Sequence, residues 1–192
     1  MKFAYAKQLI AGLSLLACSS LFAAPLTVDV SGIQSHAGLR GGQNTVLTYD
    51  IGANSTITSV SYSVNLTAFS PSWLSEIGLA FTDSNVLDGV LLRPGVGVTN
   101  AGTGTYSDVV DLVAQGLSFA VGSDGILRLE FYESFDDFAG ADGIWNFGTI
   151  TFGIDTVESE VPEPASGLLL GAGLAMLGYA KRRRRHAAAA AH

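Results

Sequence analysis

The chain of 192 residues contains a single cysteine, Cys18, which lies near the N-terminus. One cysteine cannot form an intramolecular disulfide, so stability must come from the apolar core alone or from that core plus bound metal. The sequence also has no Gly-x-Ser-x-Gly nucleophile motif and no His or Cys pairs at zinc-binding spacing. His36 lies in a Gly-rich stretch, where a solvated side chain is a better interpretation than a general base. These absences predict a protein that is not an enzyme.

Lysine is absent from the middle of the chain, and arginine is rare there. Between Pro25 and Pro164 lie all 17 acidic residues but only Arg40, Arg93 and Arg128 as cations, a formal charge of −14. Such a surface repels phosphate backbones, which excludes nucleic acid as an expected partner. It would attract divalent cations instead.

Residues 1–24 have the order of a secretory signal peptide. Two lysines are followed by an apolar run from Leu9 to Ala17 and then by small residues. This run is too short to span a hydrocarbon core of about 30 Å. Cleavage at Ala23 or Ala24 is one interpretation. The other is lipidation of Cys18, because "LLACSS" resembles a bacterial lipobox.

From Leu26 to Ile154 the apolar residues follow a period of two, which indicates β-strands rather than helices. We therefore expect residues 25–155 to form an all-β domain, an antiparallel β-sandwich or jelly roll. The expected strands are residues 26–30, 45–51, 56–69, 76–82, 86–92, 107–112, 117–121, 125–132 and 148–155.

Within these strands the alternation predicts which side chains enter the core. The strand 56–69 is unusual because its apolar residues change register between Ile57 and Val60. The other residues predicted to lie on one apolar face are Tyr62, Val64, Leu66 and Ala68, then Leu127, Leu129 and Phe131, and finally Ile150, Phe152 and Ile154.

The C-terminal part differs in composition from the body. Residues 156–164 are acidic and contain prolines, which indicates an extended linker. Residues 165–180 carry no charge and would be about 24 Å long as a helix, so a single transmembrane helix is expected. Residues 181–192 begin with cations, which by the positive-inside rule remain cytoplasmic and leave the acidic domain outside. The cations are Lys181, Arg182, Arg183, Arg184 and Arg185.

A proline pair directly before this helix fixes an extended segment at the membrane surface. The segment is Val161-Pro162-Glu163-Pro164. Together with the apolar run and the basic cluster it resembles the PEP-CTERM sorting signal of Gram-negative bacteria, which is also catalogued as the C-terminal domain of some ice-binding proteins. The sequence departs from that pattern in the "HAAAAAH" that follows the arginines.

This resemblance implies a partner and a destination. An exosortase, a membrane-embedded cysteine transpeptidase, would recognise the tail, and the protein would then be released or attached at the cell surface. Proteins with this signal usually accompany exopolysaccharide and biofilm genes. The resemblance therefore implies an exported surface or extracellular-matrix protein that is briefly anchored in the inner membrane.

The body of the chain is weakly similar to the P domain of proprotein convertases and to secreted β-sandwiches of PEP-CTERM proteins. Gly143-Ile144-Trp145 followed by an alternating strand carries this similarity. It implies a domain that supports folding or binding and has no catalytic residues.

The stretch "ESFDDFAGADG" is the most concentrated polar feature of the body. Glu133, Asp136, Asp137 and Asp142 lie within ten residues of one another around two glycines. Oxygen ligands in a flexible loop suit Ca²⁺, so these four residues are candidate calcium ligands. A solvated acidic loop is the alternative. Asp83 and Asn85 would add ligands only if the two loops meet.

Aromatic side chains raise the possibility of carbohydrate binding, because sugar rings stack on exposed aromatic faces. Trp73, which follows Ser70-Pro71-Ser72, is the candidate for an exposed stacking residue, whereas Trp145 is expected in the core. The other aromatic residues considered are Tyr106, Phe135 and Phe138.

A second class of function remains open, a secreted polysaccharide hydrolase. Glycosidases use two carboxyl groups, and Glu130 with Glu133 or Asp136 would supply such a pair. Acidic residues this abundant also form pairs by chance, so a non-enzymatic protein is the preferred interpretation.

The two ends predict processing. Intact-mass spectrometry of the exported protein should show a chain that lacks the signal peptide and everything beyond the Pro-Glu-Pro region. A mature surface protein that retains the cations at residues 181–185 would contradict this prediction.

Overall fold

The computed structural model describes residues 24–137 and 139–156. The predicted signal peptide, Pro-Glu-Pro segment, transmembrane helix and basic tail lie outside these residues. The described part contains ten β-strands and no helix. The strands are β1 (Leu26–Asp29), β2 (Ile33–Ser35), β3 (Thr45–Asp50), β4 (Thr56–Ala68), β5 (Ile77–Asp83), β6 (Gly89–Leu92), β7 (Gly102–Asp111), β8 (Phe119–Ala120), β9 (Ile126–Glu133) and β10 (Gly143–Asp155).

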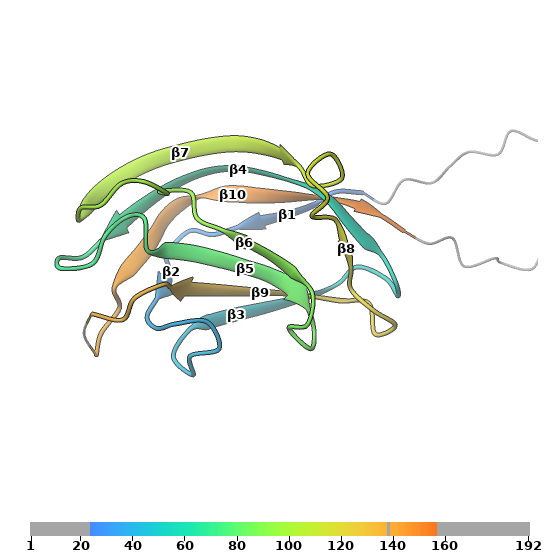
Figure 1. Ribbon diagram of the computed structural model, residues 1–192, viewed down its shortest axis with the longest axis horizontal. Coiled ribbons are helices and arrows are strands. Elements are labelled where there is room, and N and C mark those ends of the chain that lie inside the picture. Colours follow the sequence, from blue (N-terminus) through green and yellow to red (C-terminus); the bar gives the residue numbers. More distant parts are fainter. Residues whose placement is uncertain (1–23, 138, 157–192) are drawn as a thin grey trace, which may run out of the picture.

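The strands form two antiparallel sheets that face each other (Figure 1). One sheet has the order β1-β10-β4-β7, with β2 pairing β10 and β8 pairing β4. The other has the order β3-β9-β5-β6. The chain passes repeatedly from one sheet to the other, as in a two-sheet jelly roll. The expectation of an all-β fold built from antiparallel sheets is confirmed.

The strands differ from the expected ones mainly where glycine or a turn interrupts the apolar pattern. β2 was not expected, and β7 and β10 begin five residues earlier than expected. The expected strand 86–92 was wrong at its start, because residues 83–88 form a turn. There the Asp83 carboxylate accepts a hydrogen bond from the Leu87 amide (2.7 Å), and Val86 has a φ of 56°.

The pairing of β4 with β10 has two irregularities, and each changes which side chains of the strand point into the core. Thr58 of β4 has no partner between the pairs Ile57–Ile154 and Ser59–Gly153. A β-bulge of this kind reverses the inward and outward positions that follow it. It accounts for the change of register between Ile57 and Val60, both of which are buried.

The second bulge lies at Asn146 of β10, between the pairs Trp145–Leu66 and Phe147–Asn65. The Asn146 side chain donates hydrogen bonds to the Asn65 Oδ1 (2.7 Å) and to the Thr67 Oγ1 (2.8 Å), which attach the bulge to β4. Trp145 therefore enters the core although it has the opposite parity to the rest of the strand.

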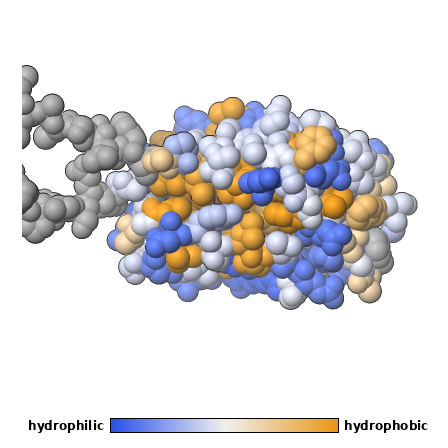
Figure 2. Space-filling view, turned by 180° about the vertical axis from the view of Figure 1, so that it is seen from behind, coloured by the Kyte–Doolittle hydropathy of each residue, from blue (hydrophilic) through white to orange (hydrophobic). Residues whose placement is uncertain are grey.

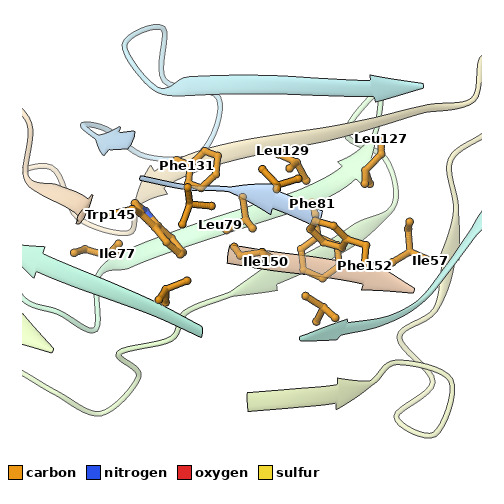
Figure 3. Close-up of a cluster of buried hydrophobic side chains, with 14 of the residues drawn as sticks. Ile57, Ile77, Leu79, Phe81, Leu127, Leu129, Phe131, Trp145, Ile150 and Phe152 are labelled. Atoms are coloured by element: carbon orange, nitrogen blue, oxygen red, sulfur yellow. The ribbon is translucent and has the colours of Figure 1, made fainter. Parts of the chain in front are cut away.

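The core fills the space between the two sheets (Figure 3). Trp145 packs edge-on against Phe131, with ring centroids 5.3 Å apart. Phe81 packs in the same way against Phe152, at 5.2 Å. The predicted inward residues of the last two strands are buried, namely Leu127, Leu129, Phe131, Ile150, Phe152 and Ile154. From the side shown in Figure 2, apolar residues lie along the middle of the molecule, with polar residues above and below.

The two ends of the described chain lie together at one end of the sandwich, because β1 pairs with the last part of β10 (Figure 1). The loops β4–β5 and β9–β10 lie at the opposite end. β10 has 13 residues and so separates the two ends by about 40 Å. We call the end with these two loops the loop end.

The core predicts a stability difference between two phenylalanines. Phe131→Ala removes a fully buried ring from the contact with Trp145 and should lower the free energy of unfolding by about 3–5 kcal/mol. Phe147→Ala is the matched control, because this ring is 58% exposed, and it should change the value by less than about 0.5 kcal/mol. Urea unfolding of both variants measures the difference. Similar losses in the two would contradict the assignment of the core.

Candidate functional site

The loop end gathers the acidic residues that the sequence singled out. β9 ends at Glu133 and β10 begins at Gly143, so the candidate calcium ligands lie in or beside the β9–β10 loop. Glu133 and Asp142 are fully buried, whereas Asp137 is half-buried and Asp136 is exposed. We call Glu133 and Asp142 the buried pair, and Asp136 and Asp137 the outer pair.

Glu133 is held in the interior by β2 and by the start of β10. Its Oε1 accepts a hydrogen bond from the Ser35 hydroxyl (2.7 Å), and its backbone N–H donates to the Ala37 carbonyl (2.9 Å). A Cβ at Gly143 would lie 2.8 Å from the Glu133 Oε1, so glycine is needed there for the carboxyl group to fit. The second oxygen, Oε2, is buried and has no hydrogen-bond partner in the described part of the chain.

Burial raises the pKa of Glu133 from 4.5 to about 8. The hydrogen bond from Ser35 acts in the opposite direction, and the negative charges of Asp142, Glu76 and Asp137 raise the pKa further. Glu133 is therefore largely protonated at neutral pH unless a cation is close to it.

Asp142 connects three segments at the loop end. Its N–H donates to the Ser35 carbonyl (3.0 Å), and its carbonyl accepts from the Phe69 N–H (2.8 Å). Its Oδ2 accepts from the Asp137 N–H (3.3 Å), whereas Oδ1 is buried and has no hydrogen-bond partner among the described residues. Burial raises the pKa of Asp142, and the charges of Asp136 and Asp137 add to this effect.

The predicted metal ligands do not form a ready-made set. Within residues 24–137 and 139–156, no group of three or more His, Cys, Asp or Glu side chains is placed so that it could hold a metal ion. Asp83, at the other end of β5 from Ile77, lies about 20 Å away along the strand, so its loop does not meet the acidic one. The calcium site formed by Glu133, Asp136, Asp137 and Asp142 stays a prediction.

Trp73 lies at the same end, in the β4–β5 loop. Its backbone N–H donates to the Glu76 Oε2 (2.7 Å), and the Ser134 N–H donates to the Glu76 carbonyl (2.9 Å), which connects the two loops. Trp73 is 43% exposed and Phe135, from the other loop, is 63% exposed. Both rings are exposed-aromatic candidates in the sequence, where no local signal shows that Trp73 and Phe135 lie close together.

These two aromatic residues line a depression of about 440 Å³ together with Pro71, Glu76 and Asp137. We call it the Trp73–Phe135 pocket. A second depression, of about 400 Å³, lies on the outer face of the β10-β4-β7 sheet and is lined mainly by Ser and Thr, such as Ser63 and Thr149. The Trp73–Phe135 pocket combines exposed aromatic faces with carboxylates. This combination suits a ligand that has both apolar faces and hydroxyl groups.

Two other candidates have internal partners or lie in the core. Trp145 is fully buried, as expected. Glu130 is also fully buried, because residues 36–44 cover it. Its Oε2 forms an ion pair with the Arg128 guanidinium (2.6 Å), and its Oε1 accepts from the Arg40 N–H (2.6 Å) and the Asn44 side chain (2.8 Å). Glu130 is thus a structural residue rather than an accessible catalytic acid.

Beyond the described residues, residues 160–185 match the family model described as the PEP-CTERM protein-sorting motif. The chain carries a PEP-CTERM sorting motif. The matched range includes the Pro-Glu-Pro triplet and the cations up to Arg185, so the resemblance seen in the sequence is confirmed. The motif indicates an exported protein that an exosortase sorts in a Gram-negative bacterium.

No curated protein matches the chain. Among solved structures, the structure of tomato aspermy virus is 12% identical with a TM-score of 0.29, over 84% of this chain and 92% of that one. The Penaeus vannamei nodavirus P-domain is 12% identical with a TM-score of 0.28, over 71% and 99%. The tobacco streak virus coat protein is 13% identical with a TM-score of 0.28, over 78% and 95%. Similarities this low support no inference about function.

The part of the chain that the structure describes has no helix long and apolar enough to cross a membrane. The expected transmembrane helix, residues 165–180, lies outside that part.

The buried pair predicts how stability depends on pH. A group whose pKa is higher in the folded protein stabilises it below the unfolded pKa, and this contribution is lost as the pH rises through the folded pKa. In chelator, the melting temperature of the protein should therefore fall between about pH 4.5 and pH 8. Glu133→Gln should flatten this dependence, because the amide cannot ionise.

Asp155→Asn is the matched control, since Asp155 is exposed at the other end of β10, and it should leave the pH dependence unchanged. Thermal melting at half-unit pH steps measures all three proteins. If the melting temperature of Glu133→Gln falls as steeply with pH as that of the wild type, Glu133 is not the group responsible for the pH dependence.

Proposed function

We propose that the protein is a non-enzymatic cell-surface or extracellular-matrix protein whose β-sandwich, residues 25–155, binds polysaccharide in the Trp73–Phe135 pocket. The observation that supports this proposal is the pairing of two exposed aromatic rings with the carboxylates of Glu76 and Asp137. Aromatic faces stack on the apolar faces of sugar rings, and carboxylates accept hydrogen bonds from hydroxyl groups.

The destination of the protein fits this ligand. The sorting motif supports export of the domain, and under the proposal the exported domain meets the exopolysaccharide of a biofilm matrix. In the predicted topology the chain enters the membrane after residue 164, and the described chain ends at the opposite end of the sandwich from the pocket (Figure 1). The pocket would then face away from the membrane.

Charge selects among polysaccharides. Residues 25–155 carry 14 acidic residues against three arginines, so a uronate or sulfated polymer would be repelled. We therefore propose a neutral polysaccharide as the ligand.

The hydrolase alternative has less support. A glycosidase needs a protonated carboxyl group at the scissile bond, and Glu133, whose pKa is raised to about 8, would match the proton-donor role by pKa. Its side chain is fully buried, however, and the same is true of Glu130. In the pocket itself, Glu76 is fixed by the Trp73 N–H, which indicates a structural role.

Affinity electrophoresis of the full chain in mild detergent tests the proposal, with gels that contain a neutral glucan, a neutral mannan or alginate. A neutral polymer should retard the protein more than alginate does. Trp73→Ala should weaken this binding about tenfold, a loss of about 1.4 kcal/mol. Phe147→Ala is the matched control, an exposed aromatic outside the pocket, and should bind like the wild type.

Binding by Trp73→Ala that equals the wild type would contradict the proposal. An assay of reducing ends in the same samples distinguishes a polysaccharide hydrolase from a binding protein. Sugar release that Glu76→Gln or Asp137→Asn abolishes would identify a hydrolase instead.

A further inference from the structure

Three buried oxygen atoms at the loop end have no hydrogen-bond partner among the described residues. They are the Glu133 Oε2, the Asp142 Oδ1 and the Ser72 Oγ, which lies near the Asp142 carboxyl group without good hydrogen-bond geometry. All three residues are 0% exposed. Because a buried polar atom without a partner destabilises the folded state, and a charged one does so more strongly, three of them at one end of the sandwich need an explanation.

The three atoms belong to one cluster. The charge of Asp142 is close enough to raise the pKa of Glu133, and the Ser72 hydroxyl approaches Asp142 closely enough to lower the pKa of Asp142. Ser35 links the two carboxyl residues, because its hydroxyl donates to Glu133 and its carbonyl accepts from the Asp142 N–H. The cluster therefore joins β2, the end of β9, the start of β10 and the β4–β5 loop.

No cation of the described chain neutralises this cluster. The ion pair found in the described part joins Arg128 to Glu130, and the Arg40 guanidinium donates to the Val86 carbonyl instead. The charge of Arg93 lowers the pKa of Tyr132 but is not among the charges that shift the pKa of Glu133 or Asp142. Half-buried Asp137 and exposed Asp136 add negative charge beside the buried pair. An external cation is the ligand that such a site would attract.

We propose that a divalent cation, Ca²⁺ in preference to Mg²⁺, binds between Glu133, Asp142 and Ser72 and so fixes the two loops that form the Trp73–Phe135 pocket. Two carboxylates and a hydroxyl leave room for water and backbone carbonyls in the six to eight oxygen ligands that Ca²⁺ takes. Mg²⁺ demands a near-ideal octahedron and gives up its water reluctantly. The effect on the pocket rests on the proposed function, whereas cation binding does not.

The position of the cluster supports the link to the pocket. Ser72 directly precedes Trp73, and the Asp137 N–H donates to the Asp142 Oδ2. The β4–β5 loop thus contributes Ser72 to the cluster and an aromatic ring to the pocket. The β9–β10 loop contributes Asp142 to the cluster and the second aromatic ring to the pocket. A cation that joined the loops would fix the distance between the two rings.

Calorimetric titration of the full chain in mild detergent with CaCl₂ at pH 7.5 tests the site. We expect a Kd of about 10⁻⁴–10⁻³ M, as in extracellular calcium modules with few charged ligands. Glu133→Gln keeps the shape of the side chain, and together with Asp142→Asn it should weaken binding at least tenfold. Asp155→Asn should change it less than twofold, and MgCl₂ should bind more weakly than CaCl₂.

A second pair of variants separates the buried ligands from the outer ones. Asp136→Asn with Asp137→Asn should change the Kd for Ca²⁺ less than Glu133→Gln does. The proposal is overturned if the wild type does not bind Ca²⁺, if Glu133→Gln binds it as well as the wild type, or if the outer pair alone abolishes binding. If the wild type does not bind calcium, and Glu133→Gln has a higher melting temperature than the wild type in CaCl₂, the buried pair of Glu133 and Asp142 holds a proton instead of a cation.

Polysaccharide binding measured in CaCl₂ and in chelator tests whether the cation fixes the two loops of the Trp73–Phe135 pocket. Calcium should increase the affinity for the neutral polymer severalfold in the wild type and not in Glu133→Gln. Calcium binding without any polysaccharide binding would reject the proposed function and leave the cation site. Polysaccharide binding that calcium does not change would reject the link between the two.

Discussion

The bulge at Asn146 decides what lies at the loop end. It allows Trp145 to pack against Phe131 while Ile150 also faces the core. By the alternation of a strand, Gly143 then points inward as Trp145 does, and it lies against Glu133. Without the bulge, the residues before Asn146 would turn to the opposite face, and the space that now receives the Glu133 carboxyl group would be lost. The core and the acidic cluster therefore depend on the same irregularity of pairing.

Much of the fold follows from local pattern. The alternation from Leu127 to Phe131 identifies β9 and its inward face. The change of register after Ile57 also shows in the sequence, and the bulge at Thr58 is its structural cause. β2 and the first half of β7 were missed because β2 has three residues and the start of β7 contains Gly102 and Gly104. Their pairing with β10 and β4 stabilises them as strands, so tertiary contacts override weak local preference.

The site was predictable in part. The alternation that places Leu127, Leu129 and Phe131 in the core also places Glu133 there, so the signal for a buried carboxyl group was present in the sequence. The pairing of Trp73 with Phe135 was not visible, because it requires β5 to lie beside β9 with Ile77 opposite Glu133. The burial of Glu130 also depends on a distant segment, the loop of residues 36–44, which covers the outer face of β9.

Under the proposal, Glu133 and Asp142 give the loop end a cation site that no side chain of the described residues fills. Transfer of an ionised carboxyl group out of water costs several kcal/mol, and no disulfide is available to hold the two loops against that cost. A proton on Glu133 reduces the cost at low pH, and under the proposal a cation does so at higher pH. Because both would occupy the same oxygen atoms, they compete, and affinity for the cation should rise as Glu133 loses its proton. The order of the aromatic pocket would then follow the pH and the divalent cations around the cell, since two hydrogen bonds, from Ser134 to Glu76 and from Phe69 to Asp142, are the direct backbone links between these loops in the described part of the chain.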